Sequence, residues 1–140
     1  MHVRADLHIH TRASDGEISP EGIVSSAVYS GLDAIAITDH DTLSGVRQIL
    51  SSNGIRIIPG VEISIAYDPG TLHILGYFPN YPAEFEKVLE RLQLARTVRF
   101  PKILERLNAL GLDITDSDVL SIAGDGQIGR PHIAKALVKR

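Results

Sequence analysis

Residues 6–10 read Asp6-Leu7-His8-Ile9-His10, at the end of a short strand expected over 3–9. In an extended strand, side chains two positions apart point to the same side, so His8 and His10 would lie together. Two neighbouring neutral imidazoles can together coordinate one metal ion such as Zn, Mn or Fe. A pair of surface histidines or the remnant of an expression tag would explain the motif equally well on its own. The segments downstream therefore decide its meaning.

Further residues of the types that bind metals recur where the next apolar segments end. A near-continuous apolar run over 32–38 predicts a strand covered on both faces, and two more strands are expected over 55–63 and 72–78. In parallel α/β folds the carboxyl ends of strands form one rim, where sites are built. We therefore expect four successive strands to deliver histidine and carboxylate to one place: Asp15 after the first, Asp39, His40 and Asp41 after the second, Glu62 in the third and His73 within the fourth.

Each of these residues also has an ordinary structural interpretation. Asp15 before Gly16 is typical of a turn. Asp41 and Thr42 are more readily explained as caps of the helix expected to start near Leu43. A hydrogen-bonded core histidine would explain His40 or His73, and Glu62 could be a solvated carboxylate. Because these explanations would have to coincide at four strand ends, we favour a metal site.

The segments between the strands carry the signals of connecting helices. Ser19 is the predicted N-cap of a helix that has Pro20 at its first position and continues to Tyr29. A second helix is expected over 43–53, ended by Gly54. Strands that alternate with helices predict parallel βαβ units, in a barrel or an open sheet.

The character of the chain changes after Pro82. Helical periodicity extends from about 83 to 110, and Pro101 should break or kink that helix. Thr115 begins a segment that can cap a short helix, and Pro131 starts a last helix that includes 132–139. We therefore divide the chain into a β/α part over 1–82 and a helical subdomain over 83–140.

Composition limits the classes of function. The 140 residues have 44% hydrophobic content, a formal net charge of -3 and no cysteine. A net negative charge does not favour binding to long duplex nucleic acid, because proteins that bind it usually carry excess positive charge. Without cysteine, any metal must be held by imidazole and carboxylate. No run approaches the length of a membrane span and the N-terminal residues lack an apolar signal core, so the cytoplasm is the expected location.

The motifs, taken together, resemble those of the polymerase-and-histidinol-phosphatase (PHP) superfamily. The resemblance covers essentially the whole chain, and is strongest to the stand-alone metal-dependent phosphoesterases that act on nucleotides and short RNA. It rests on the segments Asp6–Thr11, Ser14–Gly16, Thr38–Asp41, Gly60–Glu62, His73–Tyr77 and Gly129–Ala134.

This resemblance implies a distorted (β/α)7 barrel with two to three divalent ions (Mn, Fe or Zn) at its C-terminal rim. His8 and His10 would ligate one metal, and Glu62 would bridge it to a second metal that His73 also binds. Asp15 and His40 would hold the third. Asp39 would orient an imidazole through its other nitrogen. Arg130 and His132 would face the phosphate as catalytic residues.

The implied reaction is hydrolysis of a phosphate ester of a nucleotide or short oligonucleotide by metal-activated water. The cations would neutralise charge on the non-bridging phosphate oxygens, and Arg130 could add a bidentate contact. Two alternatives are a metal-binding, non-catalytic PHP module with a regulatory or structural role, and a histidinol-phosphate phosphatase. The helical segment after Pro82 and the closing Gly129-Arg130-Pro131-His132 count against the latter.

The chain departs from the superfamily pattern in one respect. Its members are longer and supply further ligands, including an Asp-x-His pair, from a second half that has no counterpart up to Arg140. We favour the explanation that the chain is part of a longer enzyme. A partner chain or self-association could instead complete the barrel, or a short protein could bind metal without efficient catalysis. In each case we expect the 140-residue polypeptide alone to bind metal weakly and hydrolyse slowly, because ligands are missing.

Overall fold

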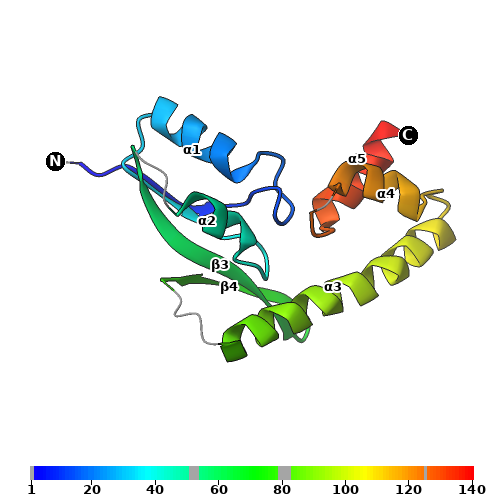
Figure 1. Cartoon of the computed structure of the whole chain (residues 1–140). Coiled ribbons are helices and arrows are strands. Elements are labelled where there is room, and N and C mark those ends of the chain that lie inside the picture. The colour runs from blue at the N-terminus through cyan, green and yellow to red at the C-terminus, as the bar shows by residue number, and fades with distance from the viewer. Residues whose placement is uncertain (1, 51–53, 79–82, 125) are drawn as a thin grey trace.

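A computed structural model describes residues 2–50, 54–78, 83–124 and 126–140. Within these ranges, four strands form one curled sheet in the order β1-β2-β3-β4 (Figure 1). Strands β1 (Ala5–Ile9), β2 (Ala34–Ile37) and β3 (Arg56–Tyr67) are parallel, whereas β4 (Gly70–Tyr77) runs antiparallel to β3. The predicted α/β class is confirmed, and the sheet corresponds to part of a barrel.

Helices α1 (Pro20–Tyr29) and α2 (Ser44–Ile49) connect the parallel strands. The predicted start of α1 is confirmed, because the Ser19 Oγ accepts a hydrogen bond from the Gly22 N–H at 3.1 Å. The α2 helix is shorter than predicted and ends at Ile49, while 51–53 lie outside the described residues.

The fourth strand departs from the predicted parallel arrangement. β3 continues to Tyr67, well past its expected exit at Ile63, and β4 returns directly after the turn at Asp68 and Pro69. A parallel connection needs a crossover of a dozen or more residues, and this turn is far too short to provide one. His73 therefore does not lie at a carboxyl end. It reaches the rim because it pairs with Ser64 in the antiparallel ladder.

The core of the β/α part surrounds β2, all four residues of which are buried. This agrees with the apolar run that predicts a strand covered on both faces. The buried cluster includes residues from α1, β2, α2, β3 and the helix that follows the hairpin: Ala27, Ile35, Ile37, Leu43, Val46, Ile49, Val61 and Leu89.

The rest of the chain consists of α3 (Ala83–Ala109), α4 (Asp116–Ala123) and α5 (Arg130–Lys139). Figure 1 shows α3 extending from beside the β3–β4 hairpin to the pair α4 and α5. The predicted capping of α4 is confirmed, since Thr115 and Asp118 form a capping box. None of the helices in the described part of the chain is both long and apolar enough to cross a membrane.

Of the break or kink predicted at Pro101, the break does not occur, because α3 passes through that residue without interruption. Proline removes one backbone hydrogen bond from a helix, but packing on both sides can hold the helix together. Phe100 and Leu104 provide that packing, since both are buried in a second cluster completed by Ile114, Val119, Ile133 and Ala136. α3 contributes to both clusters, and the division of the chain at residue 82 stays a prediction.

Candidate metal centre

Glu62 occupies the position where the segment after β2 runs alongside β3. The Asp41 N–H donates to the Glu62 carbonyl at 2.9 Å, and the Glu62 N–H donates to the Asp39 carbonyl at 3.2 Å. These two bonds form a parallel bridge between His40 and Glu62. The backbone therefore fixes an imidazole beside a carboxylate whose side chain is only 6% exposed.

His8 and His10 lie on the same side of β1 and its exit, as predicted. The Nε2 atom of each imidazole is 2.8 Å from the Glu62 Oε2, and the two Nε2 atoms are 3.1 Å apart. Ligand atoms bound to one metal at about 2.1 Å are separated by about 3.0–3.4 Å. The 3.1 Å between the two Nε2 atoms lies within this range, and the two 2.8 Å distances to the Glu62 Oε2 fall slightly below it.

The remaining candidate ligands continue this arrangement along the rim. The His10 Nδ1 is 3.1 Å from the Asp15 Oδ1, and the His40 Nε2 is 3.7 Å from the Asp15 Oδ2. On the other side, the His73 Nδ1 is 2.6 Å from the Glu62 Oε1. All six ligands expected from the sequence thus meet in three overlapping trios: His8, His10 and Glu62; His10, Asp15 and His40; His40, Glu62 and His73.

The chemistry of this donor set fits divalent metal ions. The His40 Nδ1 is buried and has no hydrogen-bond partner among the described residues, and it faces the Glu62 Oε2 at 3.8 Å, too far for a hydrogen bond. A buried polar atom without a partner is costly, and a metal ion between the two ligands would supply that partner. Nitrogen and oxygen donors of this kind suit Mn, Fe and Zn alike.

The local electrostatics hold two of the ligands in the form that binds metal. Burial would raise the pKa of Asp15, but the hydrogen bond from His10 and the nearby histidine charges lower it to about 2. Burial, together with the charge of Arg96, lowers the pKa of His40 to about 4. At neutral pH, Asp15 is therefore ionised and His40 is neutral, as metal coordination requires.

Asp39 has a different role from the predicted one of orienting an imidazole. Its Oδ1 accepts from the Thr11 N–H at 2.7 Å and from the Ser14 hydroxyl at 2.6 Å, and its Oδ2 accepts from the Thr11 hydroxyl at 2.7 Å. A Cβ atom at Gly45 would lie 2.1 Å from the Asp39 Oδ2, so α2 approaches this carboxylate as closely as glycine allows. Asp39 therefore fixes the loop that carries Asp15.

Asp41 does not cap α2, contrary to the prediction. Leu43 occupies the N-cap position and makes no side-chain bond there, although the Thr42 Oγ1 accepts from the Ser44 N–H at 3.2 Å. Asp41 is instead fully buried, and its Oδ2 accepts from the Arg96 Nε at 2.7 Å. Its Oδ1 accepts from the Ser64 N–H at 2.8 Å. This ion pair attaches α3 to the segment that carries His40.

Arg96 is a site residue that the sequence prediction missed. A usable signal exists, since Arg96 lies seven positions after Leu89 and four before Phe100, on the face of α3 that both buried residues share. A cation at an apolar-stripe position suggests a buried carboxylate partner. Only the folded chain identifies that partner as Asp41.

The start of α5, which carries Arg130 and His132, lies beside one of the candidate ligands. A Cβ atom at Gly129 would lie 2.6 Å from the Asp15 Cβ, so the start of α5 lies against Asp15. His132 is buried, and its Nδ1 accepts from the Gly129 N–H at 3.1 Å. Burial lowers the pKa of His132, while Asp15 acts in the opposite direction. Arg130 is exposed, and within the described residues it makes no hydrogen bond or ion pair with any of the six ligands.

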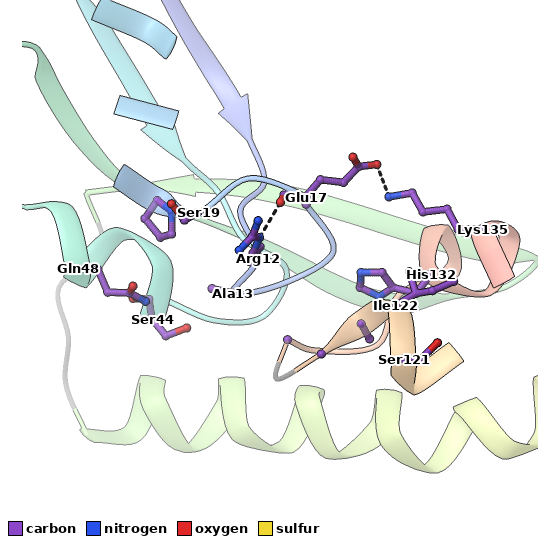
Figure 2. Close-up of a pocket in the computed structure, with 15 residues that line it drawn as sticks. Arg12, Ala13, Glu17, Ser19, Ser44, Gln48, Ser121, Ile122, His132 and Lys135 are labelled. Atoms are coloured by element: carbon purple, nitrogen blue, oxygen red, sulfur yellow. Dashed lines mark hydrogen bonds and ion pairs between the residues drawn. The ribbon is translucent and has the colours of Figure 1, made fainter. Parts of the chain in front are cut away.

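A cavity of about 890 Å³ lies between the loop after β1, the start of α2 and the α4–α5 pair (Figure 2). His132 is among its lining residues, whereas none of the six candidate ligands is. Figure 2 shows the ion pair of Lys135 with Glu17, and the Arg12 side chain that donates to the Glu17 carbonyl, at 2.7 Å. The cavity therefore adjoins the centre without containing it.

Comparison with known proteins places the metal centre in context. The model of the PHP domain family matches residues 6–116. Over 141 residues the chain is 36% identical to the 5'-3' exoribonuclease Rnm of Salmonella typhimurium, a match that covers 96% of this chain and 48% of that protein. It is 31% identical over 139 residues to the 3',5'-nucleoside bisphosphate phosphatase of Chromobacterium violaceum. This match covers 95% of this chain and 48% of that protein. The chain spans about half the length of the curated relatives it matches.

A solved structure shares the fold at comparable coverage. A proposed metal-dependent phosphoesterase from Bifidobacterium adolescentis superposes with a TM-score of 0.86 and 32% identity, covering 99% of this chain and 51% of the other. The shared half contains all the elements that carry the six ligands.

The Arg96–Asp41 ion pair yields a test of stability. Arg96→Met leaves the Asp41 carboxylate buried without its cation, so we expect the free energy of unfolding to fall by about 3–5 kcal/mol in urea denaturation. Arg99→Met is the matched control, because Arg99 is exposed on the same helix, and should cost less than about 0.5 kcal/mol. Asp41→Asn combined with Arg96→Met should recover part of the loss. Equal costs for the two single variants would contradict this role.

The lowered pKa of His40 predicts the pH dependence of the metal-free protein. In the unfolded chain His40 has the ordinary histidine pKa of 6.5, whereas in the folded chain burial and the charge of Arg96 lower this pKa to about 4. Stability is therefore lost as pH falls through this window, because the unfolded state binds more protons. In chelator, His40→Gln should show a shallower decline in unfolding free energy between pH 6.5 and 4 than the wild type. His2→Gln, which alters an exposed histidine, should keep the wild-type slope; parallel curves for all three proteins would refute the assignment.

Proposed function

The chain belongs to the PHP domain family, and on that premise we propose that it forms part of a metal-dependent phosphoesterase acting on nucleotides or short oligonucleotides. The observation that carries the proposal is the sharing of Glu62 by two of the three ligand trios, with His10 and His40 linking the third. Overlapping trios of this kind suit adjacent metal ions, and adjacent ions suit phosphoryl transfer because they contact both the attacking and the leaving oxygen.

Two to three divalent ions, Mn, Fe or Zn, are the proposed cofactors. His8, His10 and Glu62 would hold one ion, His40, Glu62 and His73 a second, and Asp15 with His40 and His10 a third. When bound, such ions lower the pKa of coordinated water and neutralise charge on phosphate oxygens. The ligands are prepared for this role, since Asp15 is ionised and His40 is neutral near pH 7.

Arg130 and His132 are the proposed phosphate-facing residues. Arg130 is exposed at the start of α5, and a guanidinium can make a bidentate contact with phosphate that lysine cannot copy. His132 accepts the Gly129 N–H at Nδ1, so its neutral ring carries the proton on Nε2. That N–H is available as a hydrogen-bond donor beside Asp15. Arg130 would orient the phosphate and His132 would donate to it.

The substrate class rests on the relatives. Two of them are named for activity on RNA and on nucleoside bisphosphates. Both substrates present a terminal phosphate on a nucleotide, which an open rim of imidazole, carboxylate and guanidinium can accommodate. We propose the same class here, with the remaining ligands supplied by a further half of the barrel, because β1 and β4 are the outer strands of the described sheet.

Phosphate release with and without metal tests the proposed function. With added Mn²⁺, we expect the protein to hydrolyse a nucleoside 3',5'-bisphosphate, and a chelator should abolish the activity. His8→Ala combined with His10→Ala should reduce Mn²⁺ affinity and hydrolysis by about 100-fold or more, since two ligands of one ion are lost.

His2→Ala is the control, because His2 is exposed and lies outside all three trios. It should leave both quantities unchanged. Binding of Mn²⁺ at wild-type affinity by the His8/His10 variant would refute the ligand assignment. Tight metal binding by the wild type without any phosphate release would instead favour a non-catalytic metal-binding module.

A further inference from the structure

One face of α3 points away from both buried clusters and carries exposed side chains in a regular pattern. Its residues are spaced three and four positions apart, so they share a face of the helix. They line a shallow depression of about 440 Å³ and form what we call the α3 strip: Arg91, Leu94, Ala95, Val98, Arg99 and Lys102. Leu94 and Val98 are 64% and 57% exposed, so the strip presents aliphatic surface between its charges.

The charges of the α3 strip are of one sign and lack partners. Among the described residues, Arg91, Arg99 and Lys102 make no hydrogen bond or ion pair. Arg96, by contrast, lies on another face of the same helix and is neutralised by Asp41. Acidic residues lie at both ends of this stretch: Glu90 is four positions before Leu94, and Glu105 is one turn beyond Lys102.

The α3 strip leads toward the candidate metal centre. Arg99 also lines a second, small cavity of about 20 Å³, together with Gly129 and Arg130. The Gly129 backbone lies against Asp15, one of the six candidate ligands. Positive charge therefore continues from the start of α5, beside the centre, through Arg99 to Arg91 and Lys102.

We propose that the α3 strip binds the phosphate backbone of a single-stranded oligonucleotide whose terminal phosphate lies at the metal centre. The placement of that end rests on the proposed function. From Arg91 to Lys102 the helix rises about 16 Å, which matches about five stacked nucleotides. The cations would contact phosphates, and Leu94 and Val98 would contact sugars and bases.

The chemistry favours this occupant over a protein segment. Three cations with no acidic residue among them complement a polyanion, whereas a protein interface of this size more often mixes both signs. The strip contains no aromatic side chain, so we expect little base preference, because stacking on aromatic rings supplies much of such preference. The overall charge of -3 argues against a long duplex, whose charge density exceeds what one strip can meet.

Binding of a labelled oligonucleotide in chelator tests the strip without hydrolysis. The probe is a short 5'-phosphorylated oligoadenylate labelled at its 3' end, measured by fluorescence anisotropy over a series of salt concentrations. Three phosphate contacts predict a slope of about -2 for log K against log salt. Arg91→Gln combined with Lys102→Gln should weaken binding about ten-fold and reduce the slope to about -0.7.

Arg56→Gln combined with Lys139→Gln is the matched control. It removes the same charge from exposed positions on β3 and α5, and should bind the probe like the wild type. Equal affinity for the strip variant and the wild type, or an equal loss in the control, would overturn the proposal, as would a wild type that does not bind the probe.

The strip variant should still hydrolyse a nucleoside 3',5'-bisphosphate at the wild-type rate, because that substrate is too short to reach Arg91 or Lys102. A wild type that binds the oligonucleotide through the α3 strip but releases no phosphate would overturn the proposed function. It would still support the α3 strip as a binding surface. Loss of bisphosphate hydrolysis in the strip variant would count against the proposal.

Discussion

The buried carboxylate of Glu62 links segments that are distant in the sequence. One of its oxygens lies 2.8 Å from the Nε2 atoms of both His8 and His10, and the other lies 2.6 Å from the His73 Nδ1. A carboxylate so enclosed needs partners for both oxygens, because burial without them is costly. The parallel arrangement of β1, β2 and β3, together with the antiparallel return of β4, supplies those partners. The register of the sheet therefore determines which ligands meet at Glu62, so a change in one would change the other.

Asp39, His40 and Asp41, which follow β2 after Thr38, each hold a different part of this arrangement. Asp39 bonds to Thr11 and Ser14 and so fixes the loop that carries Asp15. His40 faces the centre, and its buried Nδ1 lacks a hydrogen-bond partner in the part of the chain that the structure describes. Asp41 turns the other way and binds Arg96, which attaches the helical part of the chain. Three consecutive side chains thus hold the loop that carries Asp15, the metal site and α3. Because they are neighbours in the chain, a substitution of Asp39 or Asp41 should shift the backbone of His40.

Much of this could be predicted from the sequence, where local signals were strong. The Ser19–Pro20 helix start, the buried β2 run and the convergence of His8, His10, Asp15, His40, Glu62 and His73 all follow from spacing and residue type. The antiparallel return of β4 could not be predicted from alternation, because alternation does not give strand direction. The short connection at Asp68 and Pro69 is the signal that does, since it leaves no room for a parallel crossover. The partners of Asp39 and Asp41 could not be predicted either, because they lie far away in the sequence. Asp41 pairs with Arg96, and Asp39 bonds to Thr11 and Ser14. The helix break expected at Pro101 is absent because Phe100 and Leu104 pack in the second buried cluster and hold α3 together.

The account claims that six residues of this chain form the binding surface for adjacent metal ions. Anomalous X-ray diffraction from crystals soaked in Mn²⁺ tests that claim most directly. We predict at least two anomalous peaks, one between His8, His10 and Glu62 and one between His40, Glu62 and His73. Ordered Mn²⁺ at other positions only, or no peak at these ligands in well-diffracting soaked crystals, would contradict it.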